Sequence, residues 1–349
     1  MLTRRHFVIS KSNTDGMSAS APDAVSRQVK RAARVLLVSA VSAVCANALA
    51  QQPPSAATPP ASTAARSFGE IVAAAPADAW RAPDPQNLIY LDIPAGRVVI
   101  ELAPQLAPEH VANIRTLIRE KYFDGLAIVR SQDNYVVQWG DPVDKVPRKP
   151  LGSAKPSLAP EFERVLSPAA FKSFAFDPLP DRDGYAAEVG FASGFHAGRD
   201  PKTNTVWGAH CYGVVGVGRG NESTSGNGAS LYAIIGQAPR HLDRNITVVG
   251  RVLQGMPLLS ILPRGTRPLG FYATPAETTP LRAVSLAADV PATERLPIEV
   301  MRTDTPSFTQ AVEALRNRGA GDPNGWFKRP AGYVELCNIS IPVRLKPSK

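Results

Sequence analysis

Long apolar runs are nearly absent from this chain of 349 residues, and only one, residues 35–50, stands out. That run is too short and too rich in Ser and Ala to cross a bilayer comfortably as a helix. We therefore expect no integral membrane span in the mature protein. The chain is nevertheless 44% apolar, which is enough for a substantial core in one large domain or two ordinary ones.

Dense basic patches are also missing. The formal net charge is +9, but residues 1–50 contribute seven Lys and Arg against two Asp, which leaves about +4 for residues 51–349. This modest excess is not concentrated in a Lys/Arg-rich segment. The sequence therefore gives no reason to expect nucleic acid as a partner.

Three motifs fall short of the chemistry that they would support. The glycines of residues 216–220 resemble a phosphate-binding loop, but Asn221 stands where the final Gly is required. Ser193 lies one position too late for the nucleophile turn of a serine hydrolase. His210 and Cys211 are neighbours that would point to opposite faces of a strand, which disfavours a shared metal ion. We expect no cofactor, and we interpret His210 as a loop or capping residue.

The N-terminal segment has the features of an export signal. Basic residues precede the apolar run of residues 35–50, which ends in Ala48-Leu49-Ala50. A basic region, a short apolar run and small residues before a cleavage site describe a secretory signal peptide. We predict that residues 1–50 are removed and that the protein is exported to the periplasm or secreted. Residues 51–86, rich in Pro, Ala, Ser and Thr, are predicted to form a disordered linker with a short helix near residues 68–75.

Two cysteines, Cys211 and Cys337, would remain after cleavage. Export places them where a disulfide can persist. The sequence does not show whether their Cα atoms lie within the distance of about 7 Å that a disulfide needs. A disulfide and a pair of buried free thiols therefore both stay open.

The ordered part is predicted to begin at Asn87. Residues 88–93 and 97–102 alternate or run apolar on either side of a short turn, which predicts a hairpin. Pro108 then opens a predicted amphipathic helix of about three turns, because apolar residues recur at helical spacing as far as Ile118.

Residues 122–141 are the most informative stretch. Val129 to Ser131 is predicted to end one strand, and residues 135–138 are predicted to form the next, after an Asp-Asn turn. Two returning strands bring Arg130 and Gln138 to one surface beside Tyr135. That surface would offer five guanidinium N–H donors, an amide and an aromatic wall.

This stretch resembles the strand, turn and strand that carry the active site of cyclophilins, the peptidyl-prolyl cis-trans isomerases. The family pattern is an aromatic residue and Gly, then Arg, an aromatic residue, Gln and Gly-Asp. Without a gap, these places are held by Phe123, Gly125, Arg130, Tyr135, Gln138, Gly140 and Asp141. Two later segments, residues 227–234 and residues 242–256, are similar to the family as well, and Gly250 to Met256 is the most specific of these matches.

The resemblance implies a mainly β fold. The expected core is a closed antiparallel eight-stranded barrel capped by two helices, over residues 87–265. It would carry an enlarged loop region at residues 142–206 and a C-terminal extension at residues 266–331. Residues 333–343 alternate well enough to form a last barrel strand, within residues 332–349. We expect a monomer.

The resemblance also implies an activity and roles for the site residues. Rotation about a prolyl peptide bond needs neither a nucleophile nor a metal, only an apolar pocket for the ring and a donor for the twisted amide. Arg130 would be that donor, and Gln138 would orient the substrate or Arg130. The residues expected to bind the peptide are Tyr135, Val136, Tyr232, His241, Leu242, Gly218 and Arg219. The partners would be unfolded or extended polypeptides that contain proline.

Some positions depart from the family pattern. Ile128-Val129 replaces a Phe-His pair before the catalytic Arg, and Gly218-Arg219-Gly220 replaces Ala-Asn-Ala. Ser230 replaces Gln and Ile246 replaces His, and both changes are expected to remove polar partners from the groove. These departures put the turnover rate in question more than the fold.

Three other interpretations stay open. Taken alone, Arg130 could form a surface ion pair with Asp124 or Asp133. The chain could be a peptide-binding or chaperone module that keeps the groove without turnover. It could also be a structural envelope protein whose function lies in residues 266–331.

Overall fold

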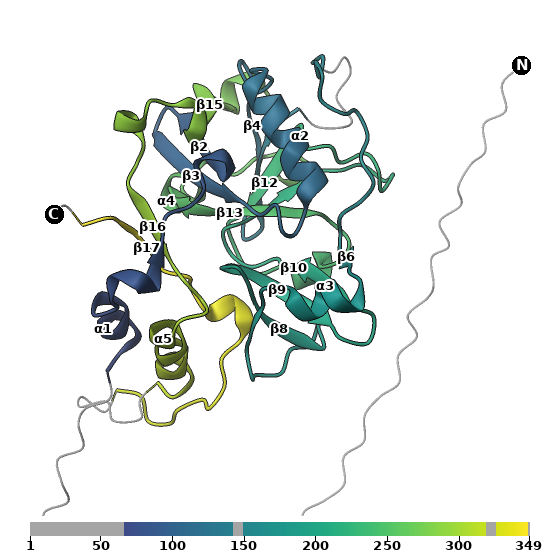
Figure 1. Ribbon diagram of the computed structural model, residues 1–349. Coiled ribbons are helices and arrows are strands. Elements are labelled where there is room, and N and C mark those ends of the chain that lie inside the picture. Colours follow the sequence, from purple (N-terminus) through teal and green to yellow (C-terminus); the bar gives the residue numbers. More distant parts are fainter. Residues whose placement is uncertain (1–65, 142–148, 319–325, 348–349) are drawn as a thin grey trace, which may run out of the picture. The chain divides into compact units, whose positions relative to one another are not determined.

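The computed structural model describes residues 66–141, 149–318 and 326–347 (Figure 1). They belong to one compact unit that spans residues 58–349. The predicted signal peptide, residues 1–50, lies outside the described residues. Among the described helices, none is long and apolar enough to cross a membrane.

An antiparallel nine-stranded sheet contains the predicted hairpin and the strands that carry the candidate site. Neighbours in the sheet follow the order β14, β4, β5, β12, β11, β13, β3, β2, β15. In that order the strands are Thr279–Pro280, Ala127–Ser131, Val136–Gly140, Ser230–Ile234, Val214–Val217, Val248–Gln254, Gly96–Leu102, Leu88–Ile93 and Ala283–Leu286.

One face of this sheet encloses the first apolar core. Alternate residues of the strands, such as Ile100 and Leu231, point into it, as the period of two in a strand requires. Helix α2 (Pro108–Arg119) adds Val111, Ile114 and Leu117 at helical spacing, and α4 (Met256–Ser260) adds Leu259. The predicted hairpin and the predicted amphipathic helix that opens at Pro108 are therefore confirmed.

The prediction of a closed eight-stranded barrel is confirmed only as a curled, mainly β sheet. The sheet has nine strands, and its order ends at β14 and β15. Both end strands come from the extension of residues 266–331, which pairs with β4 on one side and β2 on the other. Such pairing covers strand edges that would otherwise expose unpaired backbone groups. Barrel closure and a two-helix cap stay predictions.

The sequence predicted an enlarged loop region at residues 142–206, but the described part of this region also contains strands and a helix. It contributes most of a five-stranded sheet in the order β6, β10, β9, β8, β7. These strands are Arg164–Val165, Thr205–Gly208, Phe195–Asp200, Glu188–Ala192 and Asp177–Pro178. The same region contains the short helix α3 (Pro168–Ser173), which Ser167 caps.

A third sheet of three strands corrects two predictions about the ends of the chain. Its order is β1 (Trp80–Arg81), β16 (Ile298–Met301) and β17 (Val343–Leu345). The disordered linker predicted for residues 51–86 is therefore wrong from residue 66 on, except for the short helix predicted near residues 68–75, which is present. The barrel strand predicted over residues 333–343 is also wrong, because β17 pairs with β16 outside the nine-stranded sheet.

Two helices accompany the third sheet. They are α1 (Phe68–Ala73) and α5 (Pro306–Arg316), which lie side by side in Figure 1. Ser67 and Glu70 form a reciprocal capping box that starts α1. The helix predicted near residues 68–75 is therefore confirmed as α1, whereas the composition of residues 66–86 did not indicate β1, which pairs with the distant β16.

A second apolar core lies on the other face of the nine-stranded sheet. Val136, Tyr232 and Val248 of that sheet share this core with Phe191 of β8 and Phe308 of α5. The rings of Phe191 and Phe308 meet edge to face, with their centroids 5.0 Å apart. The added segments thus pack against the face of the sheet that carries Val136 and Tyr232.

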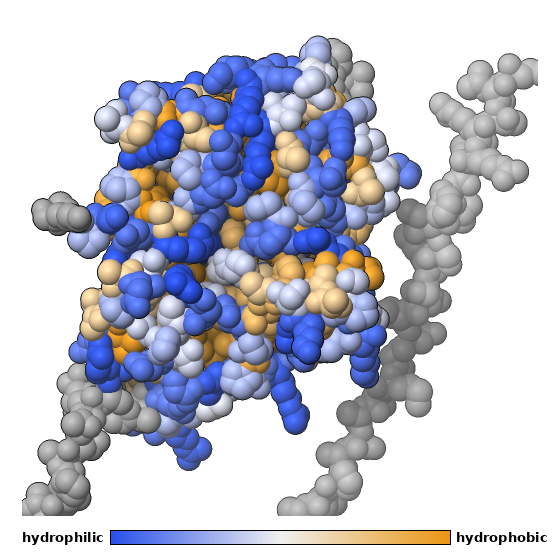
Figure 2. Space-filling view, in the orientation of Figure 1, coloured by the Kyte–Doolittle hydropathy of each residue, from blue (hydrophilic) through white to orange (hydrophobic). Residues whose placement is uncertain are grey.

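The surface shown in Figure 2 is mostly hydrophilic, with hydrophobic patches between polar side chains. Large apolar side chains that are exposed, such as Val165, Ile261 and Leu345, lie on separate elements. Scattered residues of this kind are normal for a folded surface.

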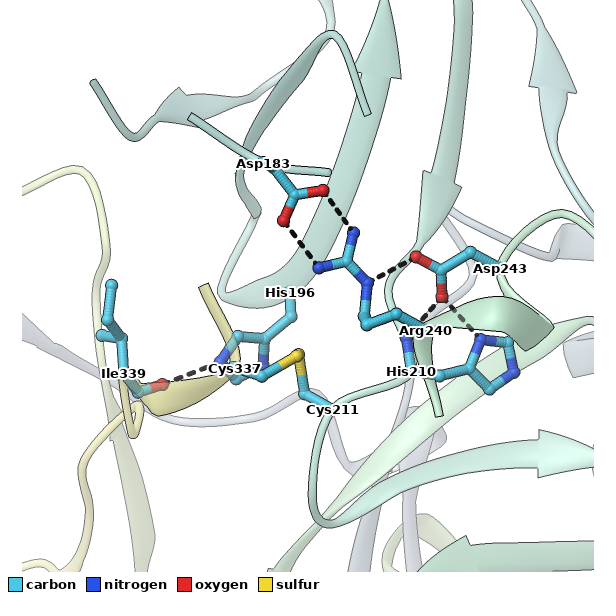
Figure 3. Close-up of a disulfide and its surroundings, with 8 residues drawn as sticks. All are labelled: Asp183, His196, His210, Cys211, Arg240, Asp243, Cys337 and Ile339. Carbon is cyan, nitrogen blue, oxygen red and sulfur yellow. Dashed lines mark hydrogen bonds and ion pairs between the residues drawn. A yellow bond between two sulfur atoms is a disulfide. The ribbon is translucent and has the colours of Figure 1, made fainter. Parts of the chain in front are cut away.

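A disulfide ties the C-terminal segment to the nine-stranded sheet. Cys211, just before β11, is bonded to Cys337, and their Cα atoms lie 4.9 Å apart (Figure 3). Of the two alternatives that the sequence left open, the structure contains the disulfide. His196 of β9 adds a hydrogen bond to the same segment, because its Nε2 lies 2.8 Å from the Ile339 carbonyl.

Acid is expected to destabilise the fold through His196. Burial lowers the pKa of His196 from 6.5 to about 4, since the charged imidazolium loses its hydration. The folded state therefore binds fewer protons than the unfolded state between these values. The free energy of unfolding therefore has its full value, with respect to His196, above pH 6.5. It falls by about 3 kcal/mol in total as the pH is lowered towards 4.

Urea unfolding at pH 7 and pH 4.5 measures this effect. We expect His196→Gln to lose less stability on acidification than the parent, because glutamine can donate to the Ile339 carbonyl without titrating. Equal losses in the parent and the variant would assign the acid sensitivity to other groups.

Candidate active site

The candidate site follows from the register of four strands. Arg130 of β4 is opposite Gln138 of β5, which is opposite Tyr232 of β12, which is opposite Gly216 of β11. Directly opposed residues on neighbouring strands project to the same face of a sheet. A bulge between Ile128 and Arg130 shifts the register of β4 at this point. The spacing of eight residues between Arg130 and Gln138 thus places both side chains in one row.

Three neighbours hold the Arg130 guanidinium. Its Nη1 donates to Gln138 Oε1 at 3.1 Å, and its Nε donates to the Leu269 carbonyl at 2.6 Å. Its Nη2 also donates to Gln132. Five N–H groups are present on a guanidinium, so this arrangement fixes the plane of Arg130 with capacity left for another acceptor.

Aromatic rings flank the same guanidinium. Its central carbon lies 5.5 Å from the Tyr135 ring centroid and 5.2 Å from that of Phe271. Partial burial lowers the pKa of Arg130, because the cation is shielded from water. A cation interacts more strongly with a carbonyl oxygen in such a partly buried site than in bulk water, because the local dielectric constant is lower.

Arg130 does not form the surface ion pair that its sequence context allowed. Within the described residues it has no carboxylate partner, and Asp133 pairs with Arg264 instead, at 3.1 Å. The acceptors that Arg130 contacts are carbonyl and amide oxygens, of Leu269, Gln138 and Gln132.

Gln138 is buried and is held at both ends. Its Oε1 accepts from Arg130, and its Nε2 donates to Ser230 Oγ at 3.0 Å. The expectation that Ser230 removes a polar partner is therefore wrong, since its hydroxyl supplies one. Ile246 does remove one, because it is apolar and packs against the second core.

Gly218 lies beside Gln138, and Arg219 follows it in the chain. A Cβ on Gly218 would lie 3.0 Å from Gln138 Nε2, so glycine leaves room for the amide. Arg219 donates to the Asn245 carbonyl at 3.1 Å, and its guanidinium stacks over Phe162, 5.3 Å from the ring centroid. The insertion thus supports the loop that carries Arg219.

The residues predicted to form the proline pocket differ in exposure. Val136 and Tyr232 are 2% and 5% exposed, so they form a floor, while Tyr135 and Leu242 are half-buried. His241 is exposed, as a rim residue would be. Burial raises the pKa of Tyr232, and nearby Tyr135 also raises it, whereas Arg130 lowers it.

The sequence did not predict two contributions to this site. Leu269 and Phe271 come from the extension and contact Arg130, although they are far from it along the chain. His210, predicted to be a loop or capping residue, is fully buried, and its Nε2 lies 3.0 Å from the Tyr232 hydroxyl. No local motif marks either contact.

The comparison with protein families decides which family the chain belongs to. Residues 88–275 match the family model described as cyclophilin type peptidyl-prolyl cis-trans isomerase. The chain belongs to this family. The match runs from β2 past α4 and includes Arg130, Gln138 and Tyr232.

One solved structure extends the likeness over most of the chain. It is cyclophilin AquaCyp293 from Hirschia baltica, at 26% identity and a TM-score of 0.59. The match covers 77% of this chain and 95% of that one. The similarity therefore reaches well beyond the segment that the family model matches.

Curated relatives match over shorter segments. A probable peptidyl-prolyl cis-trans isomerase from Brucella suis is 43% identical over 60 residues, which are 17% of this chain and 31% of the relative. The human peptidyl-prolyl cis-trans isomerase-like 1 is 34% identical over 71 residues, 20% of this chain and 40% of the relative. The chain thus spans less than half the length of these relatives.

Proposed function

We propose that this cyclophilin-family protein catalyses cis-trans isomerisation of X-Pro bonds in unfolded or extended polypeptides. The observation that carries the proposal is the row of Arg130, Gln138 and Tyr232. In it a guanidinium that has no carboxylate partner among the described residues lies beside a buried aromatic floor. Family membership and the match to a cyclophilin structure support the same activity.

The chemistry required is modest. Amide resonance makes the barrier to rotation about 18 to 20 kcal/mol, and a catalyst lowers it by stabilising the twisted amide. Arg130 would donate to the peptide at the carbonyl oxygen or the pyramidal nitrogen, while Gln138 keeps its plane fixed. Removing about 7 kcal/mol of barrier accelerates the reaction about 10⁵-fold.

Assignments for the remaining residues complete the proposal. The proline ring would rest on Val136 and Tyr232 between Tyr135 and Leu242, with His241 at the rim. Gly218 and Arg219 would contact the peptide backbone on the Gln138 side. We infer an exported monomer, periplasmic or secreted, that assists protein folding after residues 1–50 are removed. The mechanism needs no cofactor.

A proline-limited refolding reaction tests this function. The purified chain should accelerate the slow phase of a substrate protein with a native cis-proline, at catalytic ratios. The rival function is peptide binding without turnover, which Ile246 and the Leu269 carbonyl on Arg130 favour. Binding of proline peptides with no acceleration of refolding would establish that rival.

A further inference from the structure

A buried polar network ends at the floor of the proposed pocket. The buried network consists of Tyr232, His210, Asp243, Arg240 and Asp183, drawn in part in Figure 3. Their side chains are almost fully shielded, with His210 at 0% exposure and Arg240 at 2%. Buried polar groups of this kind are held in place because an unmet hydrogen bond is costly.

The hydrogen-bond directions in the buried network can be assigned. Asp243 Oδ1 accepts from the His210 backbone N–H and from Nδ1, both at 2.9 Å. Burial opposes ionisation of Asp243, but bonds from His210 and Arg240 outweigh it and lower the pKa of the carboxyl. An ionised carboxylate only accepts, so Nδ1 carries the proton. Nε2 is left to form the hydrogen bond with the Tyr232 hydroxyl, 3.0 Å away.

His210 engages the Tyr232 hydroxyl at the far end of the ring. The hydroxyl lies over Gly216, where a Cβ would overlap it, and its hydrogen bond is made to His210 at 3.0 Å. The ring is therefore fixed at its far end, and what it can offer a ligand is an apolar surface.

The other end of the buried network fixes the pocket rim. Arg240 donates to Asp243 at 2.6 Å and to both oxygens of Asp183 at 2.8 and 3.0 Å. Arg240 begins the short helix of residues 240–242, which also carries His241 and Leu242. One guanidinium thus links the rim to Asp183, a residue of the insertion.

We propose that four residues of the buried network are positioning residues: His210, Asp243, Arg240 and Asp183. They fix the floor of the proline pocket, Tyr232, relative to its rim, His241 and Leu242. The insertion of residues 142–206, through Asp183, would thereby influence the affinity of the pocket for its ligand. This inference rests on the proposed function, because it assigns the pocket of the same site. Arg130 and Gln138 lie outside the buried network. Disrupting the network should therefore change the affinity for peptide more than the turnover of bound peptide.

A matched pair of variants tests the proposal. Asp183→Asn removes the charge that anchors Arg240. Asp181→Asn is the control, because Asp181 is equally shielded, at 6% against 4%, and pairs with Arg316 rather than with the buried network. We expect Asp183→Asn to raise KM for a proline tetrapeptide about tenfold with kcat within about twofold, and Asp181→Asn to change neither. Equal KM values in the two variants would overturn the proposal.

A double-mutant cycle covers the case in which Asp183→Asn fails to fold. Tyr232→Phe and His210→Ala are combined, and peptide affinity is measured by calorimetry in each variant. If His210 acts through the Tyr232 hydroxyl, His210→Ala should weaken binding much less in the Tyr232→Phe background. Equal fold-changes in both backgrounds would show that His210 does not position Tyr232.

The two possible failures can be told apart. Loss of the proposed function would show as a parent chain without isomerase activity, whatever the variants do. The proposal about the buried network depends on ratios between variants. Calorimetric affinity for the same peptide supplies those ratios even if no turnover is found.

Discussion

Arg130→Lys is expected to lower kcat/KM for isomerisation of a proline peptide by about 10²-fold or more. Arg130 now donates to Gln138 and to the Leu269 carbonyl at the same time, while its face lies against Tyr135. A single ammonium cannot keep these contacts and also reach a twisted amide. A protease-coupled assay with a short X-Pro peptide measures the change.

Arg97→Lys is the matched control for Arg130→Lys. Arg97 also stacks on a tyrosine, 4.5 Å from the Tyr90 ring centroid, and it donates to Asp92 through two nitrogens. It lies on β3, outside the row of the site. We expect Arg97→Lys to leave kcat/KM unchanged. An Arg130→Lys variant as active as the parent would remove Arg130 from the mechanism.

Loss of the Cys211–Cys337 disulfide should have the largest effect on stability. The bond closes a loop with a sequence separation of 126 residues. Constraining so long a loop in the unfolded chain is worth about 5 kcal/mol, at the upper end of the usual range of about 2 to 5 for native disulfides. We expect Cys337→Ser to lower the free energy of unfolding by about this amount, as measured in urea.

Reductant provides the control for this change. The parent in dithiothreitol should unfold at the same urea concentration as Cys337→Ser, and the variant should not respond to the reductant. A parent whose unfolding midpoint is the same with and without reductant would show that the bond does not form or does not contribute.

Sequence patterns predicted those elements whose formation depends on residues close together in the chain. The hairpin of β2 and β3, the amphipathic α2 and the strands around Arg130 follow from periodicity and turn residues. The five-stranded sheet does not, because its strands are short and its Gly198 makes room for the Trp207 ring, a contact between two strands. Periodicity says little about such pairings.

The candidate site divides in the same way. Arg130 and Gln138 were predicted because one turn brings their strands together. The Leu269 carbonyl lies 139 residues from Arg130 in sequence, and Asp243 lies 33 residues from His210. Partners so distant leave no spacing signal. The role of Ser230 was not predicted for a simpler reason. The family pattern has Gln at this position, and the shorter Ser was expected to leave Gln138 without a partner, but its hydroxyl accepts a hydrogen bond from Gln138.

Exchange NMR on a peptide with one X-Pro bond tests the central claim most directly. Separate cis and trans signals are recorded with and without a catalytic amount of the protein. Arg130 beside the Tyr232 floor predicts exchange cross-peaks within a mixing time of a second or less, against tens to hundreds of seconds for the free peptide. Signals that shift on binding but show no exchange would contradict the account.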